Sequence, residues 1–356
     1  MGNASGTGKG KGQSVSLDLK EKSLEKWIAE AKKANSLKHI ERLDLSRQEL
    51  EGIPDEIGKL VSLKILQVYD NGLKTISAEI GKLSNLTALG LNENALTTLP
   101  PEIGGLESLT MLDLRHNNLS TLPSEIGNLV NLTILFLRFN RLTELPSTIE
   151  NLTKLEVLSV RNNKLQALPE CINKLVALQT LDLQRNALTE LPVIDKLGKL
   201  HTLDLQANQL EHLPSGTHRL TSLKHLHLKY NHVMELPEDL GKLTNLEELD
   251  LESNRISTLP SSCSKLQNLK KLYISRNHFA KLPSCIEKMV NIEELYLNDN
   301  SLTECQEVIH LTKLRTLNIS TNTIKKLPKG LKHHSLLRDF DASSNDISSI
   351  DSLAPF

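Results

Sequence analysis

Few residues of this chain have the type and spacing that catalysis or nucleotide binding would require. The segment Gly6-Thr7-Gly8-Lys9-Gly10 has the composition of a phosphate-binding loop, but Asn3 stands where that loop needs its first glycine. Gly10 stands where it needs Ser or Thr, and neither a preceding strand nor a following helix is expected there. The 12 histidines show no metal-ligand spacing, and no nucleophile elbow or Cys/His constellation is present. We therefore expect no enzyme activity, no cofactor and no metal.

Side chains suited to protein recognition do recur at a fixed spacing. Arg115, Arg138 and Arg161 follow one another at 23-residue intervals, with apolar and aromatic residues at neighbouring outward positions. The first predicted binding patch comprises Arg115, His116, Ile134, Phe136, Arg138, Phe139, Val157, Arg161 and Arg185. Exposed aromatic rings beside arginines are typical of binding hot spots. Asp113 and Asp182 are expected to offset part of the like-charge repulsion. The alternative is ordinary variation along a long surface.

A second patch is predicted further along the chain, where a basic strip is followed by an acidic one. It comprises His225, His227, Lys229, Tyr230, Glu248, Asp250, Glu252, Tyr273 and Tyr296, and Glu294 and Asp299 continue it. The inner surface would then be basic and aromatic in its first half and acidic and tyrosine-rich in its second half, which suits two partners or one elongated partner of complementary charge. The alternative for this second patch is solvation alone.

A repeated pattern positions all of these side chains. The asparagine of Leu-x-x-Leu-x-Leu-x-x-Asn-x-Leu recurs every 23 residues from Asn71 to Asn345, and the step shortens to 22 before Asn208 and Asn322. With Gln48 at the first such position, fourteen units are visible. A strand alternates its faces, so Leu135 is expected inside while the third, fifth, seventh and eighth positions face outward. The asparagine amides would satisfy backbone groups at the turn and form an internal hydrogen-bond ladder.

The other half of each unit predicts the opposite side of the stack. Its pattern is Leu-Pro-x-x-Ile-Gly-x-Leu, as in residues 122–129. Proline cannot donate a ladder hydrogen bond, so it marks the exit from the strand, and a short helical or 3₁₀ segment should follow. Short segments on one side and strands on the other force the stack to curve. Single units cannot close a core, whereas a stack of leucine layers can.

The ends of the chain differ from the repeats. Residues 1–14 are rich in Gly, Ser and Lys and are predicted to be a disordered tail. Residues 15–39 should form an N-terminal cap, with a degenerate strand at 15–19 and a helix from the N-cap Ser23 to about Ala34. The alternative role for this helix is docking of a partner. Residues 40–356 hold the fourteen units, and polar residues such as Asp341 and Asp346 should blunt the last strand edge.

Composition limits the class of partner and the compartment. The chain of 356 residues has 42 basic and 43 acidic residues and a formal net charge of -1, which gives no general attraction to nucleic acid. Its four cysteines are scattered, and no signal peptide or long apolar run is visible. These features predict a reduced, soluble, cytoplasmic protein that is monomeric. Asn-x-Thr sequons such as Asn85-Leu86-Thr87 fall within the repeat pattern and are interpreted as its by-product.

The 23-residue unit, with matching positions such as Pro123, Ile126, Gly127 and Asn140, resembles the Ras-group leucine-rich-repeat family. This resemblance covers residues 40–350. It implies an α/β leucine-rich-repeat solenoid, a curved horseshoe with a concave parallel sheet, short convex 3₁₀ segments and an N-terminal capping helix. It also implies a non-enzymatic scaffold in intracellular signalling, whose partners include small GTPases and a protein phosphatase. The phosphatase-docking motif of such scaffolds is incomplete here, because Val15 lacks its basic neighbour and Leu17 replaces the Phe.

The start Met-Gly-Asn resembles N-myristoylated leucine-rich-repeat proteins, which would make Gly2 the acylated residue. Gly6 stands where Ser or Thr is favoured, and the alternative is a plain start of small residues. One acyl chain binds membranes weakly, so attachment at the inner membrane surface would be reversible. A second functional hypothesis follows, in which the chain is a regulatory or targeting subunit of an enzyme such as a phosphatase and is tethered through this lipid.

Overall fold

The computed structural model describes residues 13–17, 23–34 and 36–348. The chain divides after Leu178 into two compact units, which we call the first unit and the second unit. The predicted tail and the acylation site Gly2 lie outside the described residues, apart from the last two residues assigned to that tail.

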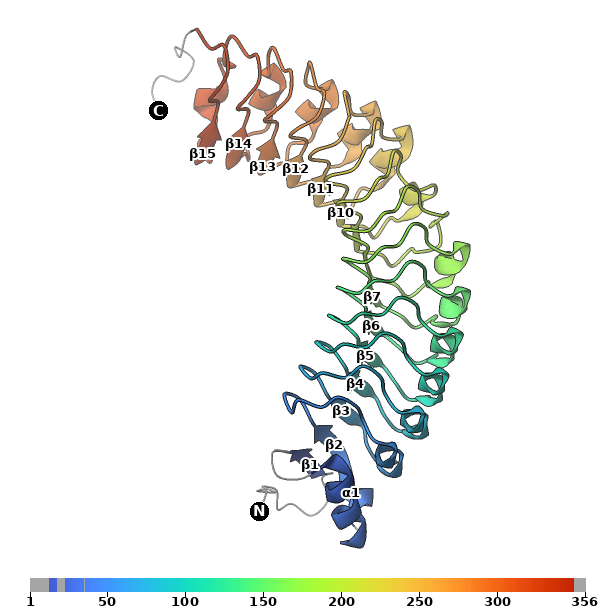
Figure 1. Ribbon diagram of the computed structural model, residues 1–356. Coiled ribbons are helices and arrows are strands. Elements are labelled where there is room, and N and C mark those ends of the chain that lie inside the picture. Colours follow the sequence, from blue (N-terminus) through green and yellow to red (C-terminus); the bar gives the residue numbers. More distant parts are fainter. Residues whose placement is uncertain (1–12, 18–22, 35, 349–356) are drawn as a thin grey trace. The chain divides into compact units, whose positions relative to one another are not determined.

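Parallel strands, each paired with the next one along the chain, build the first unit (Figure 1). They are β1 (Gln13–Ser16), β2 (Ile40–Asp44), β3 (Ile65–Gln67), β4 (Ala88–Gly90), β5 (Met111–Asp113), β6 (Ile134–Phe136) and β7 (Val157–Ser159). Strands one repeat apart pair without slippage, so that Leu112 lies beside Leu135 and Leu135 beside Leu158. Equivalent residues of successive repeats therefore become lateral neighbours.

The second unit repeats this arrangement. Its strands are β8 (Thr180–Asp182), β9 (Thr202–Asp204), β10 (His225–His227), β11 (Glu248–Asp250), β12 (Lys271–Tyr273), β13 (Glu294–Tyr296), β14 (Thr316–Asn318) and β15 (Asp339–Asp341). All neighbouring pairs from β8 to β15 are parallel. The predicted polar residues Asp341 and Asp346 line the end of this unit together with Ser343 and Ser344, at and after the last of these strands.

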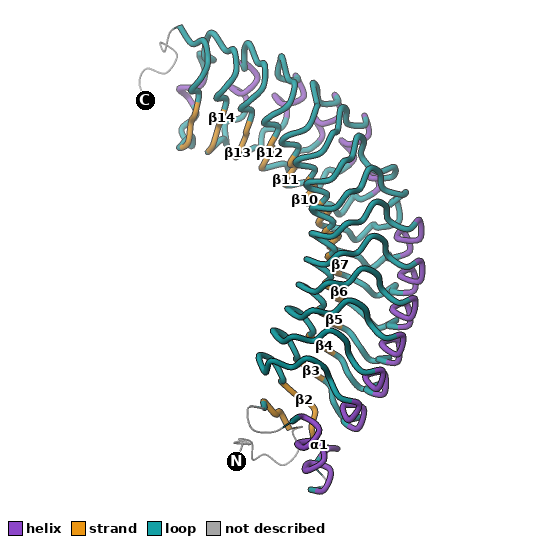
Figure 2. The backbone as a smooth tube through the Cα atoms, viewed as in Figure 1, coloured by secondary structure: helices purple, strands orange, loops and turns teal. Residues whose placement is uncertain are grey.

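Short 3₁₀ helices lie on the side opposite the strands in both units (Figure 2). In the first unit they are η1 (Leu37–His39), η2 (Asp55–Lys59), η3 (Ala78–Lys82), η4 (Pro101–Gly105), η5 (Ser124–Asn128), η6 (Ser147–Asn151) and η7 (Glu170–Lys174). In the second they are η8 (Thr217–Arg219), η9 (Glu238–Lys242), η10 (Ser261–Lys265), η11 (Ser284–Lys288), η12 (Gln306–His310) and η13 (Leu331–His333). No helix is described between β8 and β9, where the repeat is one residue shorter.

Proline starts most of these helices for a clear reason. Pro123 has an extended backbone at the N-cap of η5, and its carbonyl accepts a 3.1 Å hydrogen bond from the N–H of Ile126. Proline has no backbone N–H, and no hydrogen bond from the nitrogen is required at the start of a helix. Its fixed φ also directs the chain out of the strand. The prediction of a short 3₁₀ segment after the proline is confirmed, and with it the leucine-rich-repeat fold.

Leucine side chains fill the space between strands and 3₁₀ helices. Leu135 and Leu137 are fully buried, and Leu132 and Leu142 of the same repeat are as well. Each such side chain stabilises the fold by about 1.5–3 kcal/mol relative to its exposed state. The inward and outward positions predicted from strand alternation are therefore correct, and the outward side chains are left available for recognition.

The repeat asparagines join neighbouring repeats by hydrogen bonds to the backbone. In the second unit, Oδ1 of Asn254 accepts from the N–H of Val233 at 3.0 Å, while its Nδ2 donates to the carbonyls of Leu228 and Leu251 at 2.9 and 3.0 Å. Asn254 is buried, so water cannot reach these backbone groups, and the asparagine side chain supplies the hydrogen bonds that they would otherwise lack. The predicted hydrogen-bond ladder is confirmed, although its rungs run from side chain to backbone.

The N-terminal cap contains the helix α1 (Leu24–Lys33), which begins after Ser23. The hydroxyl of Ser23 accepts a hydrogen bond from the N–H of Lys26 at 3.4 Å, and Leu24 and Ile28 are buried. Strand β1 covers 13–16 and so begins two residues before the predicted strand 15–19, whose residues 18 and 19 lie outside the described residues. Residues 13 and 14 thus belong to the sheet and not to the tail, because they pair with β2. Within the described residues, no helix is long and apolar enough to cross a membrane.

The eighth position of every repeat has a left-handed backbone. Phe139, Arg185, Ala207 and Tyr230 stand there with φ between 52° and 58°. This conformation normally favours glycine, since a Cβ atom crowds the following carbonyl. Here the N–H of Phe139 donates to the carbonyl of Arg161 at 2.9 Å, and such bonds between repeats hold the turn. The side chain at the eighth position of the repeat thereby lies on the strand side of its unit, which we call the inner face.

Candidate functional site: two clusters on the inner faces

The inner face of the first unit carries a group that we call the arginine–aromatic patch. It consists of Arg115, His116, Ile134, Phe136, Arg138, Phe139, Val157 and Arg161, which lie on or directly after β5, β6 and β7. All of these side chains are half-buried or exposed. The strand register places Asp113 beside Phe136 and Phe136 beside Ser159, so the arginines two residues further on fall at equivalent positions. The three arginines therefore occupy equivalent positions of successive repeats.

The positive charge of Arg115 is neutralised by Asp113 of the preceding strand β5. Its Nε and Nη2 donate to the two carboxylate oxygens of Asp113 at 2.8 and 2.5 Å. Asp113 is only 4% exposed, which makes this a bidentate, charge-assisted pair at the border of the core. The hydrogen bond to Asp113 raises the pKa of Arg115 above its usual value. The predicted compensation by Asp113 is present, so Arg115 adds little net charge to the patch.

Two guanidinium groups lie close to the ring of Phe136. The Cζ atoms of Arg115 and Arg138 are 5.3 and 5.6 Å from the centroid of its ring, within the range of cation–π attraction. At the neighbouring left-handed positions, the rings of His116 and Phe139 stack with centroids 4.3 Å apart and planes 11° apart. Phe139 is 40% exposed despite its size. These contacts hold two aromatic rings in place at the surface.

Arg138 and Arg161 have no acidic partner among the described residues. The Nε atom of each is buried without a hydrogen-bond partner there, and neither guanidinium forms an ion pair in the described part of the chain. A buried donor without an acceptor costs free energy that a bound acceptor would return. Two cationic groups beside two aromatic rings therefore form the part of this face best prepared for an acidic ligand.

Arg185, the ninth predicted member of the first patch, belongs to the second unit. It follows β8, is exposed, and occupies a left-handed eighth position. Asp182 of β8 accepts a hydrogen bond from the backbone N–H of Gln184 at 3.2 Å and so helps to shape the turn before it.

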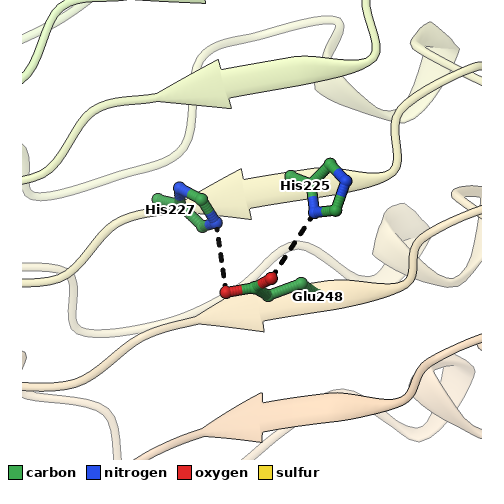
Figure 3. A group of neighbouring side chains, drawn as sticks. All are labelled: His225, His227 and Glu248. Carbon is green, nitrogen blue, oxygen red and sulfur yellow. Dashed lines mark ion pairs between the residues drawn. The ribbon is translucent and has the colours of Figure 1, made fainter.

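Histidines and carboxylates of three neighbouring strands gather in the second unit. His225 and His227 point from β10 toward Glu248 on β11 (Figure 3). His225 Nδ1 lies 3.5 Å from one carboxylate oxygen of Glu248, and His227 Nε2 lies 3.5 Å from the other. On the opposite side, His227 Nδ1 is 3.8 Å from the carboxylate of Asp204 on β9. We call these four side chains the histidine–carboxylate cluster.

Burial and charge act on this cluster in opposite directions. Burial lowers the pKa of His227, but the carboxylates of Asp204, Glu248 and Asp250 outweigh it and leave that pKa raised. Burial raises the pKa of Asp250 to about 6, although the N–H of Glu252 donates to it. Several carboxylates thus meet two imidazoles at half-buried positions.

The remaining members of the second predicted patch are paired with one another. Lys229 Nζ donates to Glu252 at 2.6 Å and lies 5.0 Å from the ring centroid of Tyr230. The rings of Tyr273 and Tyr296 stack with centroids 5.0 Å apart, and the Tyr273 hydroxyl donates to Glu294 at 3.0 Å. The basic and acidic strips of this unit therefore neutralise each other locally. Adjacent strands bring these opposite charges within contact, so the basic and acidic strips of the second patch are not separate from each other.

The second predicted patch already contained His225, His227 and Glu248, but their approach to one another and to Asp204 was not predicted, because Glu248 and Asp204 are remote from both histidines along the chain. The usable signal was the repeat length itself. Residue 248 is one repeat after residue 225, and parallel register makes such residues lateral neighbours. His-x-His on a strand additionally places both imidazoles on the same face.

Comparison with known proteins agrees with this architecture. The family described as "leucine-rich repeat region" matches residues 78–164 and 217–354, and the chain belongs to the leucine-rich-repeat family. A solved leucine-rich-repeat protein of Leptospira interrogans is 35% identical, with a TM-score of 0.87 over 95% of this chain and 85% of that one. No curated protein matches.

Two receptor structures are more distant. A TDR receptor is 27% identical, with a TM-score of 0.79 over 93% of this chain and 62% of that one. The ectodomain of the Arabidopsis receptor kinase HAESA, solved in complex with an N-terminally extended IDA peptide hormone, is 25% identical. Its TM-score is 0.57, over 94% of this chain and 66% of the HAESA chain.

Proposed function

We propose that this protein is a non-enzymatic interaction scaffold that binds a partner protein on the arginine–aromatic patch of its first unit. The observation that carries the proposal is the absence of acidic partners for Arg138 and Arg161 among the described residues, beside the exposed ring of Phe139. A segment with carboxylates and one or two apolar side chains would complement these groups.

The patch is organised before any partner arrives. Phe136 contacts two guanidinium groups, and Phe139 is stacked on His116. Ordering of long side chains is one of the main costs of association, and here part of that cost is already met within the fold. Aromatic and arginine side chains are also the residue types that contribute most to the centres of protein interfaces.

The peptide-hormone complex of HAESA supports a protein or peptide ligand for this chain too. The more specific role that we propose is an adaptor in intracellular signalling, with a small GTPase among its partners, acting in the cytoplasm. A regulatory subunit of a phosphatase, held at a membrane by acylation of Gly2, is the alternative. These finer assignments come from the sequence resemblance and stay predictions.

A capture experiment tests the proposal. Immobilised full-length protein should retain its partner from lysate of the source cells, and the partner is then identified by mass spectrometry. The double substitution Arg138→Glu and Arg161→Glu should reduce its recovery at least tenfold, and Phe136→Ala should reduce it as well.

The control is Arg141→Glu, which makes one such Arg-to-Glu change at an exposed position in the same repeat as Arg138 but outside the patch. It should leave recovery unchanged. Circular dichroism melting must first show that all variants are folded. Equal recovery of every retained protein by the wild type and the folded double variant would refute the assignment of this surface.

A further inference from the structure

The histidine–carboxylate cluster has no role in the proposed partner surface, and its donor atoms suggest a second ligand. We propose that His225, His227 and Glu248 bind one divalent transition-metal ion of the zinc type on the inner face of β10 and β11 (Figure 3). This site is separate from the arginine–aromatic patch, which lies in the first unit, so either assignment can fail without the other.

The geometry is close to what such an ion needs. Zn²⁺ binds imidazole nitrogen and carboxylate oxygen at about 2.0–2.2 Å, which places tetrahedral ligand atoms about 3.3 Å apart. Each imidazole nitrogen that faces Glu248 lies 3.5 Å from a carboxylate oxygen, and the three ligand atoms lie within 4.8 Å of one another. Small side-chain rotations would complete the coordination without any movement of the strands.

His227 presents the nitrogen that a metal would use. Its Nε2 is buried and lacks a hydrogen-bond partner among the described residues, although it faces Glu248. Its other nitrogen faces the carboxylate of Asp204 at 3.8 Å. A metal-bound histidine usually directs its second nitrogen to a carboxylate, which fixes the ring and makes the first nitrogen a better ligand. Asp204 is therefore a positioning residue in this proposal.

The surrounding charge also favours a cation. The register places His227 between Asp204 and Asp250 on the two flanking strands. The nearby lysine Lys229 is already paired with Glu252 at 2.6 Å. A divalent ion would thus meet an excess of carboxylates. Imidazole with carboxylate is a donor set that suits Zn²⁺, Ni²⁺ or Cu²⁺ better than Mg²⁺ or Ca²⁺.

Three protein ligands leave at least one coordination position open toward the inner face. In structural zinc sites four protein ligands are the rule, whereas three protein ligands leave room for water or for a group from another molecule. An imidazole, thiolate or carboxylate of a bound protein could complete the coordination. The metal would then add a directional contact to a face on which Lys229 is already paired with Glu252.

The test uses untagged full-length protein that has been stripped with a chelator and titrated with ZnCl₂ in a calorimeter. We expect one Zn²⁺ per chain. Replacement of both ligands, His225→Ala with His227→Ala, should abolish this binding. Asp204→Asn should weaken it about 10–100-fold, as expected for a partner of a ligating histidine. His278→Ala, at an exposed histidine outside the cluster, is the matched control and should bind as the wild type does.

Titration with Co²⁺ gives a second readout that does not depend on affinity alone. Intense visible absorption bands are expected for low-coordinate cobalt in the wild type and should be missing in the double histidine variant. Melting curves in the absence of metal should show that this variant is folded. Zn²⁺ binding that is equal in the wild type and the folded double variant, or no binding to the wild type, would overturn the proposal.

Discussion

The side-chain amide of Asn140 donates a 2.8 Å hydrogen bond to the backbone carbonyl of Leu114, which belongs to the preceding repeat. The same side chain accepts from the N–H of Leu119 at 3.0 Å and donates to Leu137 at 3.0 Å. One buried residue thus satisfies three backbone groups, and it does so across the boundary between two repeats.

Asn140→Ala should therefore lower the free energy of unfolding by about 2–4 kcal/mol, because buried backbone groups would lose their partners. Asn140→Asp should also destabilise, since an oxygen would replace the donor that faces two carbonyls. Denaturant unfolding measures both changes. Asn131→Ala is the control, because Asn131 makes its 2.9 Å bond to Glu107 at an exposed site. An equal loss at both asparagines would contradict the role assigned to burial.

Gly216 should not tolerate a side chain. Its φ is +85°, and a Cβ atom there would lie 2.6 Å from the Cβ of Asp195. Both the torsion and the contact penalise Gly216→Ala, for which we expect a loss of about 1–3 kcal/mol in thermal or denaturant unfolding. Gly198→Ala is the matched control, as no atom would lie within 4 Å of a Cβ added at that residue. It should be neutral or slightly stabilising.

Replacement of Ala207 by glycine should stabilise the fold. It occupies a left-handed eighth position with φ of 52°. Ala207→Gly relieves the crowding of Cβ, and we expect a gain of about 0.5–1 kcal/mol after the entropy cost of glycine is included. Ala187→Gly, in the adjacent repeat but with an ordinary φ, should instead lose about 0.5–1 kcal/mol. This interpretation requires that Ala207→Gly raises the melting temperature and that Ala187→Gly lowers it.

Glu307 provides a test of pH dependence. Its Oε2 is buried without a hydrogen-bond partner among the described residues, and burial is the main cause that raises its pKa above 4.5. The folded state then binds more protons than the unfolded state just above that pH, so stability falls as pH rises through this window. Glu307→Gln should raise stability at about pH 7 and change little at about pH 3. A variant less stable than wild type at neutral pH would disprove this.

Much of this structure could be predicted because the sequence repeats. The spacing of Asn71, Asn94 and their successors determined the register, and strand alternation then placed Phe136 and Arg138 outward while Leu135 and Leu137 were buried. The helix after Ser23 followed from a capping residue and an apolar face. These features depend on local chemistry that one repeat already contains.

Other features depend on contacts between repeats and are not visible along the linear chain. The eighth position hosts Asp70, Phe139 and Ala207, which share no propensity for a left-handed backbone, so no residue type indicated that conformation. Likewise, the approach of His225 to Glu248 needs two strands in register. The compensation of Lys229 by Glu252 arises in the same way and cancels the charge that the linear pattern assigned to separate strips.

The left-handed eighth position has a consequence for how such chains diversify. Its torsion is held by main-chain bonds such as that from Phe139 to the carbonyl of Arg161, and not by the side chain that stands there. A ring, a cation, an acid or a methyl group can therefore be exchanged at this point with only a small change in fold stability. Each repeat thus offers one interchangeable display site, and new specificity can arise by single substitutions while the scaffold is inherited unchanged.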